Sequence, residues 1–286
     1  MTVGSRRVRA LLDPSPFAAA HERAIGAMGR DRIGPAPADL AARHAPRVRD
    51  AAIATWRARM VNEHRSSAVF AAMLPQLIEA SVPFDVQTAT LRAATDEIFH
   101  AALCGDVVAA FVGVPDAEAE GELTPLPRHE GVDPAERVLR NVLFVGCLSE
   151  TVAVGLLSEE RELATEPWVR AVLEVILADE VAHTRLGWQF VAARAPSLDR
   201  AARDRVSAYF RVAFGYLEAR ELELLPVSPP LPDADLRARE AVGLCGGDGA
   251  RDVFYGTLSS VIVPRLTELG FDAARAWEER RWSPSA

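Results

Sequence analysis

The chain has 286 residues, a formal net charge of −8 and 49% hydrophobic residues, which is the balance of a globular protein. The acidic charge argues against nucleic-acid binding, which generally needs a basic surface. No uninterrupted apolar run approaches a membrane span, and Asp13 with its flanking prolines argues against a secretion signal. Three cysteines without a C-x-x-C pair favour a reducing compartment, so we expect a cytoplasmic protein without nucleic-acid or membrane partners.

An all-α protein is predicted, in which four long helices follow an irregular N-terminal segment, residues 1–46, that holds a short helix at about 15–29. The long helices are expected at about 47–81, 85–112, 134–162 and 166–194. Asp85 is expected to cap the second helix, and Asp133, followed by Pro134, to cap the third.

Three further helices are predicted beyond the fourth, at about 198–224, 233–243 and 250–268. We therefore expect a helical bundle over residues 47–195 and a helical extension over 196–286 that packs on it within one compact domain.

The connections predict how the four long helices are joined. Few residues separate the first helix from the second, or the third from the fourth, and short links make antiparallel neighbours. The second and third are joined by about twenty residues, 114–133, which is long for a structureless loop inside a compact domain. The length is explained if the segment runs from one end of the bundle to the other, because a 30-residue helix is about 45 Å long. The prediction is two hairpins joined by a long crossover.

Each long helix carries an apolar stripe at heptad spacing, interrupted by a carboxylate or by a carboxylate and an imidazole one turn apart. The interrupting residues are Glu63, Glu97, His100, Glu150, Glu180 and His183. A buried carboxylate without a partner costs on the order of several kcal/mol, and four together also repel one another. The chain contains no lysine. Arginine pairs would neutralise some of the charge, whereas two divalent metal ions would neutralise all of it and use both imidazoles, a donor set that favours iron or manganese.

The pattern resembles the ferritin-like di-iron carboxylate proteins, in which two helices each provide a glutamate and two others each provide Glu-x-x-His. The motifs are Glu97-Ile98-Phe99-His100 and Glu180-Val181-Ala182-His183, and the lone glutamates precede them by 34 and 30 residues. One such motif is a weak signal, but two at matched distances from a glutamate are a strong one. The resemblance covers about residues 50–195 and implies a four-helix bundle around a metal pair.

The resemblance also implies roles for the six residues, which would be the metal ligands and thereby the catalytic residues. One iron would be bound by Glu63 and His100, the other by Glu150 and His183, with Glu97 and Glu180 as bridges. The alternative is a set of buried polar residues satisfied by other side chains.

Two aspartates are given a supporting role by the same resemblance. In bacterial multicomponent di-iron hydroxylases, an aspartate before the motif glutamate hydrogen-bonds the ligating histidine of the opposite motif. This implies the pairs Asp96–His183 and Asp179–His100, which would fix the orientation of each imidazole. Ordinary solvated or ion-paired acids are the alternative for both aspartates.

The activity implied is that of an enzyme in which two iron ions use dioxygen as co-substrate to hydroxylate, desaturate or N-oxidise a small organic substrate. An external reductase or ferredoxin would supply electrons, and a manganese–iron pair stays open. The arylamine N-oxygenases share the motif spacing, but Ile176 stands where they carry an additional histidine ligand, so the atom oxidised stays open. Cys104, one turn after His100, speaks against a tyrosyl-radical enzyme.

Two other classes of function stay open at this point. Iron storage or peroxide detoxification, as in ferritins and rubrerythrins, would share the metal site, although the C-x-x-C rubredoxin motif is absent and about ninety residues follow the bundle. An enzyme is expected to be a monomer or homodimer, whereas ferritin-like storage would form a large cage. A metal-free binding or scaffolding bundle is the third class.

Overall fold

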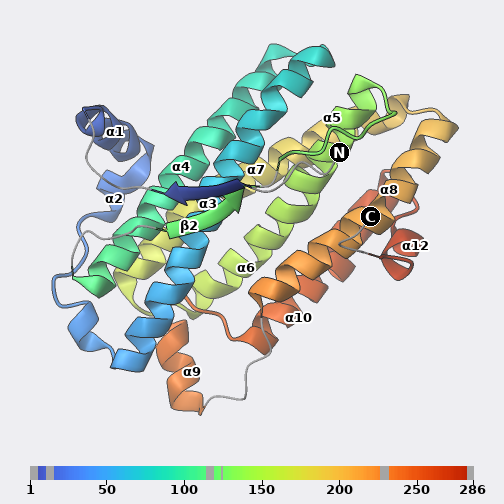
Figure 1. Ribbon diagram of the computed structural model, residues 1–286. Helices are drawn as coiled ribbons and strands as arrows, with labels where there is room; N and C mark the ends of the chain where they lie inside the picture. The colour runs from blue at the N-terminus through green and yellow to red at the C-terminus, as the bar shows by residue number, and fades with distance from the viewer. Residues whose placement is uncertain (1–5, 11–15, 114–118, 124, 226–231, 282–286) are drawn as a thin grey trace.

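The protein is described here by a computed structural model that covers residues 6–10, 16–113, 119–123, 125–225 and 232–281. The described part is predominantly helical, which confirms the all-α prediction (Figure 1). The long helices are α3 (Pro46–Glu79), α4 (Phe84–Val112), α7 (Pro167–Arg194) and the continuous helix formed by α5 (Pro134–Val142), η3 (Leu143–Ser149) and α6 (Glu150–Leu163).

The remaining elements lie before and after these long helices. The N-terminal elements are β1 (Arg6–Ala10), α1 (Ala18–Ile25), η1 (Gly26–Arg30), α2 (Asp31–Ile33) and η2 (Ala41–Arg43), and β2 (Ala119–Leu123) lies in the crossover. The C-terminal elements are η4 (Ala195–Ser197), α8 (Arg200–Leu224), α9 (Asp233–Glu240), α10 (Gly247–Thr257), η5 (Leu258–Ile262), α11 (Val263–Glu268) and α12 (Ala273–Glu278). The helix predicted at about 250–268 corresponds to α10, η5 and α11, which follow one another without a break. Helix α12 was not predicted.

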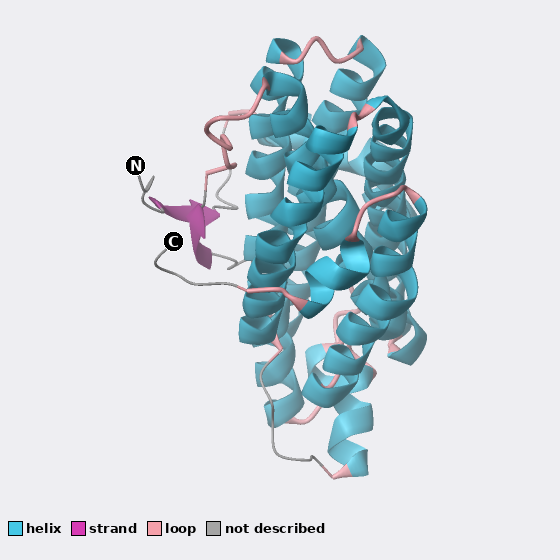
Figure 2. Cartoon of the chain, turned by 90° about the vertical axis from the view of Figure 1, so that its right-hand side faces the viewer, coloured by secondary structure: helices cyan, strands magenta, loops and turns pink. Residues whose placement is uncertain are grey.

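The long helices run side by side as a bundle (Figures 1 and 2). Helix α3 packs along α4, α6 packs along α7, and α4 contacts α7, so the two hairpins face each other. Their bounds lie within two residues of the predicted ones. Asp133 caps α5 as predicted, because its carboxylate accepts hydrogen bonds from the backbone N–H groups of Ala135 and Glu136. Asp85 is not the cap of α4, since that helix already begins at Phe84.

The crossover was predicted as a long connection without secondary structure, but part of it forms a strand. Residues Ala119–Leu123 form strand β2, which pairs antiparallel with β1 near the N-terminus, and β2 packs against α3 (Figure 1). The register places Arg7 opposite Glu122 and Arg9 opposite Glu120. The two short strands therefore tie the crossover and the N-terminal segment to the outer side of the first hairpin.

The helix from Pro134 to Leu163 contains a π-helical stretch, η3, immediately before Glu150. Such wide turns are rare and occur frequently at functional sites. This helix alone among those described passes a length and hydropathy test for a membrane span, and 61% of its most apolar window is buried inside the protein. The core helix of a soluble protein passes the same test.

Two glycines let the π-helical stretch and α7 approach each other closely. A Cβ atom added to Gly146 would lie 2.8 Å from the Cα atom of Gly187, and one added to Gly187 would lie 2.6 Å from the backbone of Gly146. No side chain fits at either position while the two backbones stay where they are. The contact sets the spacing between the segments that carry Glu150 and His183.

We expect Gly146→Ala to lower the free energy of unfolding by about 1–3 kcal/mol, because the two helices must separate to admit one methyl group. Gly256→Ala is the matched control, since Gly256 is an exposed residue of helix α10 with no atom within 4 Å of an added Cβ. The control should raise stability by about 0.5–1 kcal/mol through the lower backbone entropy of the unfolded chain. Urea denaturation of both variants measures this. Equal stability of Gly146→Ala and the unmodified protein would contradict the packing described.

The apolar core has two parts with a polar layer between them. One part includes Phe70, Leu143 and Phe190 and continues into the C-terminal helices. The other includes Trp56 and Ile176 and continues into the N-terminal segment. Along α3, α4 and α7 the chain passes from one part to the other at the level of Glu63, Glu97 and Glu180, whereas along α6 it does so only after Val152. Of the apolar residues at the expected heptad positions of the four long helices, Leu74, Val86 and Val154 are only half-buried.

The C-terminal residues cover both the side and one end of the bundle. Helix α10 packs on α6, and α8 packs on α5 and the π-helical stretch. At the end of the bundle, the Trp56 Nε1–H donates to the carbonyl oxygen of Val242 at 3.1 Å, and the Glu166 N–H donates to the carbonyl oxygen of Ala241 at 2.9 Å. These hydrogen bonds close the interior at the end of the bundle that contains Trp56.

Candidate metal centre

The structure brings all six predicted site residues into one cluster between the two hairpins. Five of them are buried and Glu63 is partly buried. Their donor atoms form two overlapping groups in which all atoms lie within 4.8 Å of one another. The first group is Glu63, Glu97, His100 and Glu180, and the second is Glu97, Glu150, Glu180 and His183. Glu97 and Glu180 belong to both groups, which are the positions that the resemblance gives to bridging ligands.

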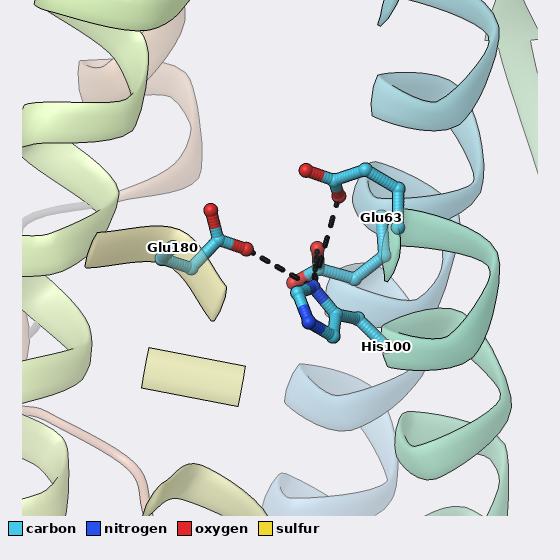
Figure 3. A group of neighbouring side chains, drawn as sticks. Glu63, His100 and Glu180 are labelled. Carbon is cyan, nitrogen blue, oxygen red and sulfur yellow. Dashed lines mark ion pairs between the residues drawn. The ribbon is translucent and has the colours of Figure 1, made fainter. Parts of the chain in front are cut away.

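The first group is centred on His100 of helix α4. Its Nδ1 atom lies 3.1 Å from Glu180 Oε1, 3.7 Å from Glu63 Oε2 and 4.0 Å from Glu97 Oε2. Figure 3 shows Glu180 directed toward His100 from the left and Glu63 from above. Three helices, α3, α4 and α7, therefore supply the donors of this group.

The second group repeats the arrangement around His183 of helix α7. Its Nδ1 atom lies 3.3 Å from Glu180 Oε2, 3.3 Å from Glu97 Oε1 and 3.8 Å from Glu150 Oε2. Each histidine thus faces the glutamate of its own motif and the glutamate of the opposite motif. The π-helical stretch ends at Ser149, so it leads directly into the donor Glu150.

The spacing and an unsatisfied carboxylate oxygen fit small divalent ions. Oxygen and nitrogen donors about 2.0–2.2 Å from one ion lie roughly 3–4 Å from each other, which is the range seen around both imidazoles. Glu97 Oε2 is buried and has no hydrogen-bond partner. A buried carboxylate oxygen left unsatisfied inside a donor group is compatible with a metal ion bound there. The cluster can hold metal ions; their identity is not determined by these contacts.

The two aspartates lie on the far sides of the imidazoles. Asp179 Oδ2 is 3.2 Å from His100 Nε2, and Asp96 Oδ2 is 3.4 Å from His183 Nε2. Both hydrogen bonds cross between α4 and α7 in the combination that the resemblance implied. With Nε2 held by a carboxylate, the Nδ1 atom of each ring is left facing the glutamates. Arg92 pairs with Asp96 at 2.6 Å.

The electrostatics of the cluster raise the proton affinity of both histidines. Burial opposes a charged imidazole, but hydrogen bonds to Asp179, Glu180 and Glu63 outweigh it and hold the pKa of His100 well above its usual value. Burial likewise opposes charge on His183, and its carboxylate partners, Asp96 first, raise its pKa in the same way. In the metal-free protein both rings therefore hold a proton more firmly than an exposed imidazole does.

The glutamates respond in different directions. Burial, followed by repulsion from Glu180, raises the pKa of both Glu97 and Glu150 well above the usual value. Burial acts in the same direction on Glu180, but hydrogen bonds with Glu150, His100 and His183 outweigh it and lower the pKa of Glu180. Without metal the cluster therefore holds protons where metal ions would place positive charge.

A buried ion pair near the cluster had not been predicted. Arg59 Nη2 donates to Glu160 Oε2 at 2.6 Å, and the side chains are 12% and 10% exposed. The Arg59 guanidinium also lies over the Trp56 ring, 4.4 Å from its centroid. Arg59 is one turn before Glu63 on α3, so the pair borders the polar layer on the side of Trp56.

We expect Arg59→Met to lower the free energy of unfolding by about 3–5 kcal/mol, because Glu160 is left buried without its partner. The double variant Arg59→Met/Glu160→Met should regain most of that loss, since no uncompensated charge remains. Denaturation in guanidinium chloride compares the two variants. If the double variant is as unstable as the single one, the cost lies in the packing of Arg59 and not in its charge.

Ile176 is fully buried within the apolar part of the core around Trp56. No additional imidazole is present at that position of α7, which agrees with the departure from the arylamine N-oxygenases noted in the sequence. Cys104, one turn after His100, is also fully buried. Burial raises the pKa of its thiol well above the usual range, so it stays a neutral core residue.

No protein-family model matches this chain, and no curated protein matches it either. The functional assignment therefore rests on the geometry and chemistry of the cluster.

Proposed function

We propose that the protein is a di-iron enzyme on a ferritin-like four-helix bundle, which uses dioxygen to oxidise a small organic substrate. The observation that carries the proposal is the sharing of Glu97 and Glu180 between two donor groups, each completed by one histidine and one further glutamate. Two ions bound in this way would be adjacent, so two ferrous irons held there could together supply two electrons to dioxygen. The order of two hairpins and a long crossover supports the same family.

The residues of the chain have separable tasks in this proposal. Glu63 and His100 would bind one ion, Glu150 and His183 the other, and Glu97 and Glu180 would contact both. The irons supply the redox chemistry with dioxygen. Asp96 and Asp179 hold the imidazoles in the orientation that presents Nδ1 to the metal position.

The apolar surroundings of the cluster serve this chemistry by excluding water. Phe70 packs against His183 with ring centroids 5.3 Å apart, and Phe99 lies 6.1 Å from His100. In the part of the core around Trp56, Met60 and Cys104 are fully buried, as is Trp56 itself. A dry site strengthens electrostatic interactions and protects reactive species from side reactions with water.

The experiment that tests the proposal is anaerobic loading with ferrous iron followed by exposure to air-saturated buffer. We expect about two iron ions per chain, from the two donor groups, and rapid dioxygen uptake. Gel filtration of the same sample separates the classes of function, because a monomer or dimer favours an enzyme and a 12- or 24-subunit cage favours iron storage. A protein that takes up no iron would be a metal-free bundle, and the proposal would be wrong.

A further inference from the structure

A small pocket in the core lies against His183, on the side of the polar layer that faces the first hairpin turn. It is lined by residues of all the long helices, among them Phe70 of α3, Thr90 of α4, Val142 of α5 and Gly187 of α7. The lining is apolar except for Thr90 and His183. Half-buried Val86 and Leu186 lie on its outer side, so solvent is close.

Both polar residues of the lining are already satisfied. The Thr90 hydroxyl donates to the Val86 carbonyl oxygen at 2.9 Å, and His183 Nε2 is hydrogen-bonded to Asp96 at 3.4 Å. A water molecule in the pocket would find few partners, and an apolar lining of this kind favours apolar guests such as xenon. An ionic guest would find no arginine among the lining residues to pair with.

The space available limits the guest to a few atoms. The pocket offers about 20 Å³ of free space, where one water molecule needs roughly 10–15 Å³ on the same measure. An aromatic ring does not fit without movement of the lining side chains. The guest is therefore small and uncharged, and it does not require hydrogen-bond partners.

We propose that this pocket is the site where dioxygen is held against the His183 side chain, one step from the metal centre, and that it is reached from solvent past Val86 and Leu186. The assignment rests on the proposed function, in which dioxygen is the co-substrate, and adds where the gas enters. Dioxygen is diatomic, apolar and uncharged, so it matches the volume and the lining of the pocket. Phe70 and Gly187 form the walls that bring it against His183.

Xenon is the probe for this site, since it has the polarity of a dissolved gas and is visible in electron density. Crystals of the full chain under xenon pressure should show a xenon atom in the pocket, in contact with Phe70 and Val142. Xenon found only elsewhere would overturn the assignment. Toluene soaked into separate crystals should leave the pocket empty, and density for toluene there would assign it to the organic substrate and not to dioxygen.

A matched pair of variants tests the pocket in solution. Val142→Leu adds volume beside the pocket, whereas Val138→Leu adds the same volume one turn away, among Met73 and Leu77. In the ferrous protein at low dioxygen, Val142→Leu should slow oxidation about fivefold or more, which corresponds to roughly 1 kcal/mol in the entry barrier. Val138→Leu should change it less than about twofold, and both variants should bind iron as the parent does. Equal rates in the two variants would overturn the proposal, and the xenon experiment decides if either variant fails to fold.

The two proposals fail in different ways. Xenon in the pocket of a protein that binds iron but consumes no dioxygen would disprove the proposed function, and with it the assignment of the pocket to dioxygen. Rapid dioxygen uptake without xenon in the pocket, and without an effect of Val142→Leu, would leave the function intact and disprove the pocket alone.

Discussion

Glu180→Ala is expected to abolish binding of both metal ions, whereas Glu63→Ala is expected to abolish only one. Glu180 belongs to both donor groups and Glu63 to one. Metal content after ferrous or cobalt loading and gel filtration should fall from about two ions per chain to none in the first variant and to one in the second. Inductively coupled plasma mass spectrometry measures it directly, and cobalt absorption reports the coordination.

Glu174→Ala is the control for this comparison, because Glu174 lies on the same helix as Glu180 but has a side chain that is 51% exposed. It should bind two ions. Circular dichroism of all three variants shows whether the fold is kept. If Glu63→Ala and Glu180→Ala lose the same number of ions, Glu180 is not shared between two metals, and the bridging arrangement is wrong.

Metal affinity is expected to fall steeply as the pH is lowered from 8 to 6. The pKa values of His100, His183, Glu97 and Glu150 are raised in the metal-free protein, so these groups carry protons that the metals must displace. Each proton released per ion makes the apparent dissociation constant about tenfold weaker per pH unit. One proton released per ion therefore gives about a tenfold change per pH unit, and each further proton steepens the dependence.

Titration calorimetry with manganese in two buffers of different ionisation enthalpy counts these protons. The sign follows from the direction of the pKa shifts, because raised values mean protonated donors at neutral pH and hence stronger competition in acid. Affinity that stays constant between pH 6 and 8, with no proton release, would show that the donors are already deprotonated in the metal-free protein. The electrostatic account of the cluster would then be wrong.

The polar layer could be predicted from sequence because its signal is local. Glu97 and His100 are three residues apart, so one helical turn places both on the same face, and the same holds for Glu180 and His183. Heptad spacing then identified that face as buried. The crossed hydrogen bonds of Asp96 and Asp179 were available only through the resemblance, since an aspartate next to a motif has no local feature that names its partner.

Other features depend on contacts that no local pattern encodes. Arg59 and Glu160 are 101 residues apart, and the sequence holds many arginines that would serve a buried glutamate equally well. Strands β1 and β2 have only five residues each, RRVRA and AEGEL, and although polar residues alternate with small or apolar ones, Val8 is the only β-branched residue in either strand. The π-helical stretch before Glu150 was not indicated by any local pattern, and it contains Gly146, whose backbone packs against Gly187.

The position of Asp85 illustrates a smaller failure of the same kind. Aspartate is a preferred capping residue, but Pro83 takes the cap position of α4, which leaves Asp85 in the first turn. There its carboxylate accepts a hydrogen bond from the N–H of Val86 at 2.9 Å and still favours the positive end of the helix. The helix was therefore predicted correctly and its first residue was not.

The most direct test of the account is a crystal structure of the protein after anaerobic loading with ferrous iron, with anomalous data collected at the iron edge. Two anomalous peaks are expected between the hairpins, each next to the Nδ1 atom of one histidine, with Glu97 and Glu180 in contact with both. A structure in which iron is absent from this layer, or in which His100 and His183 turn Nδ1 away from the glutamates, would contradict it.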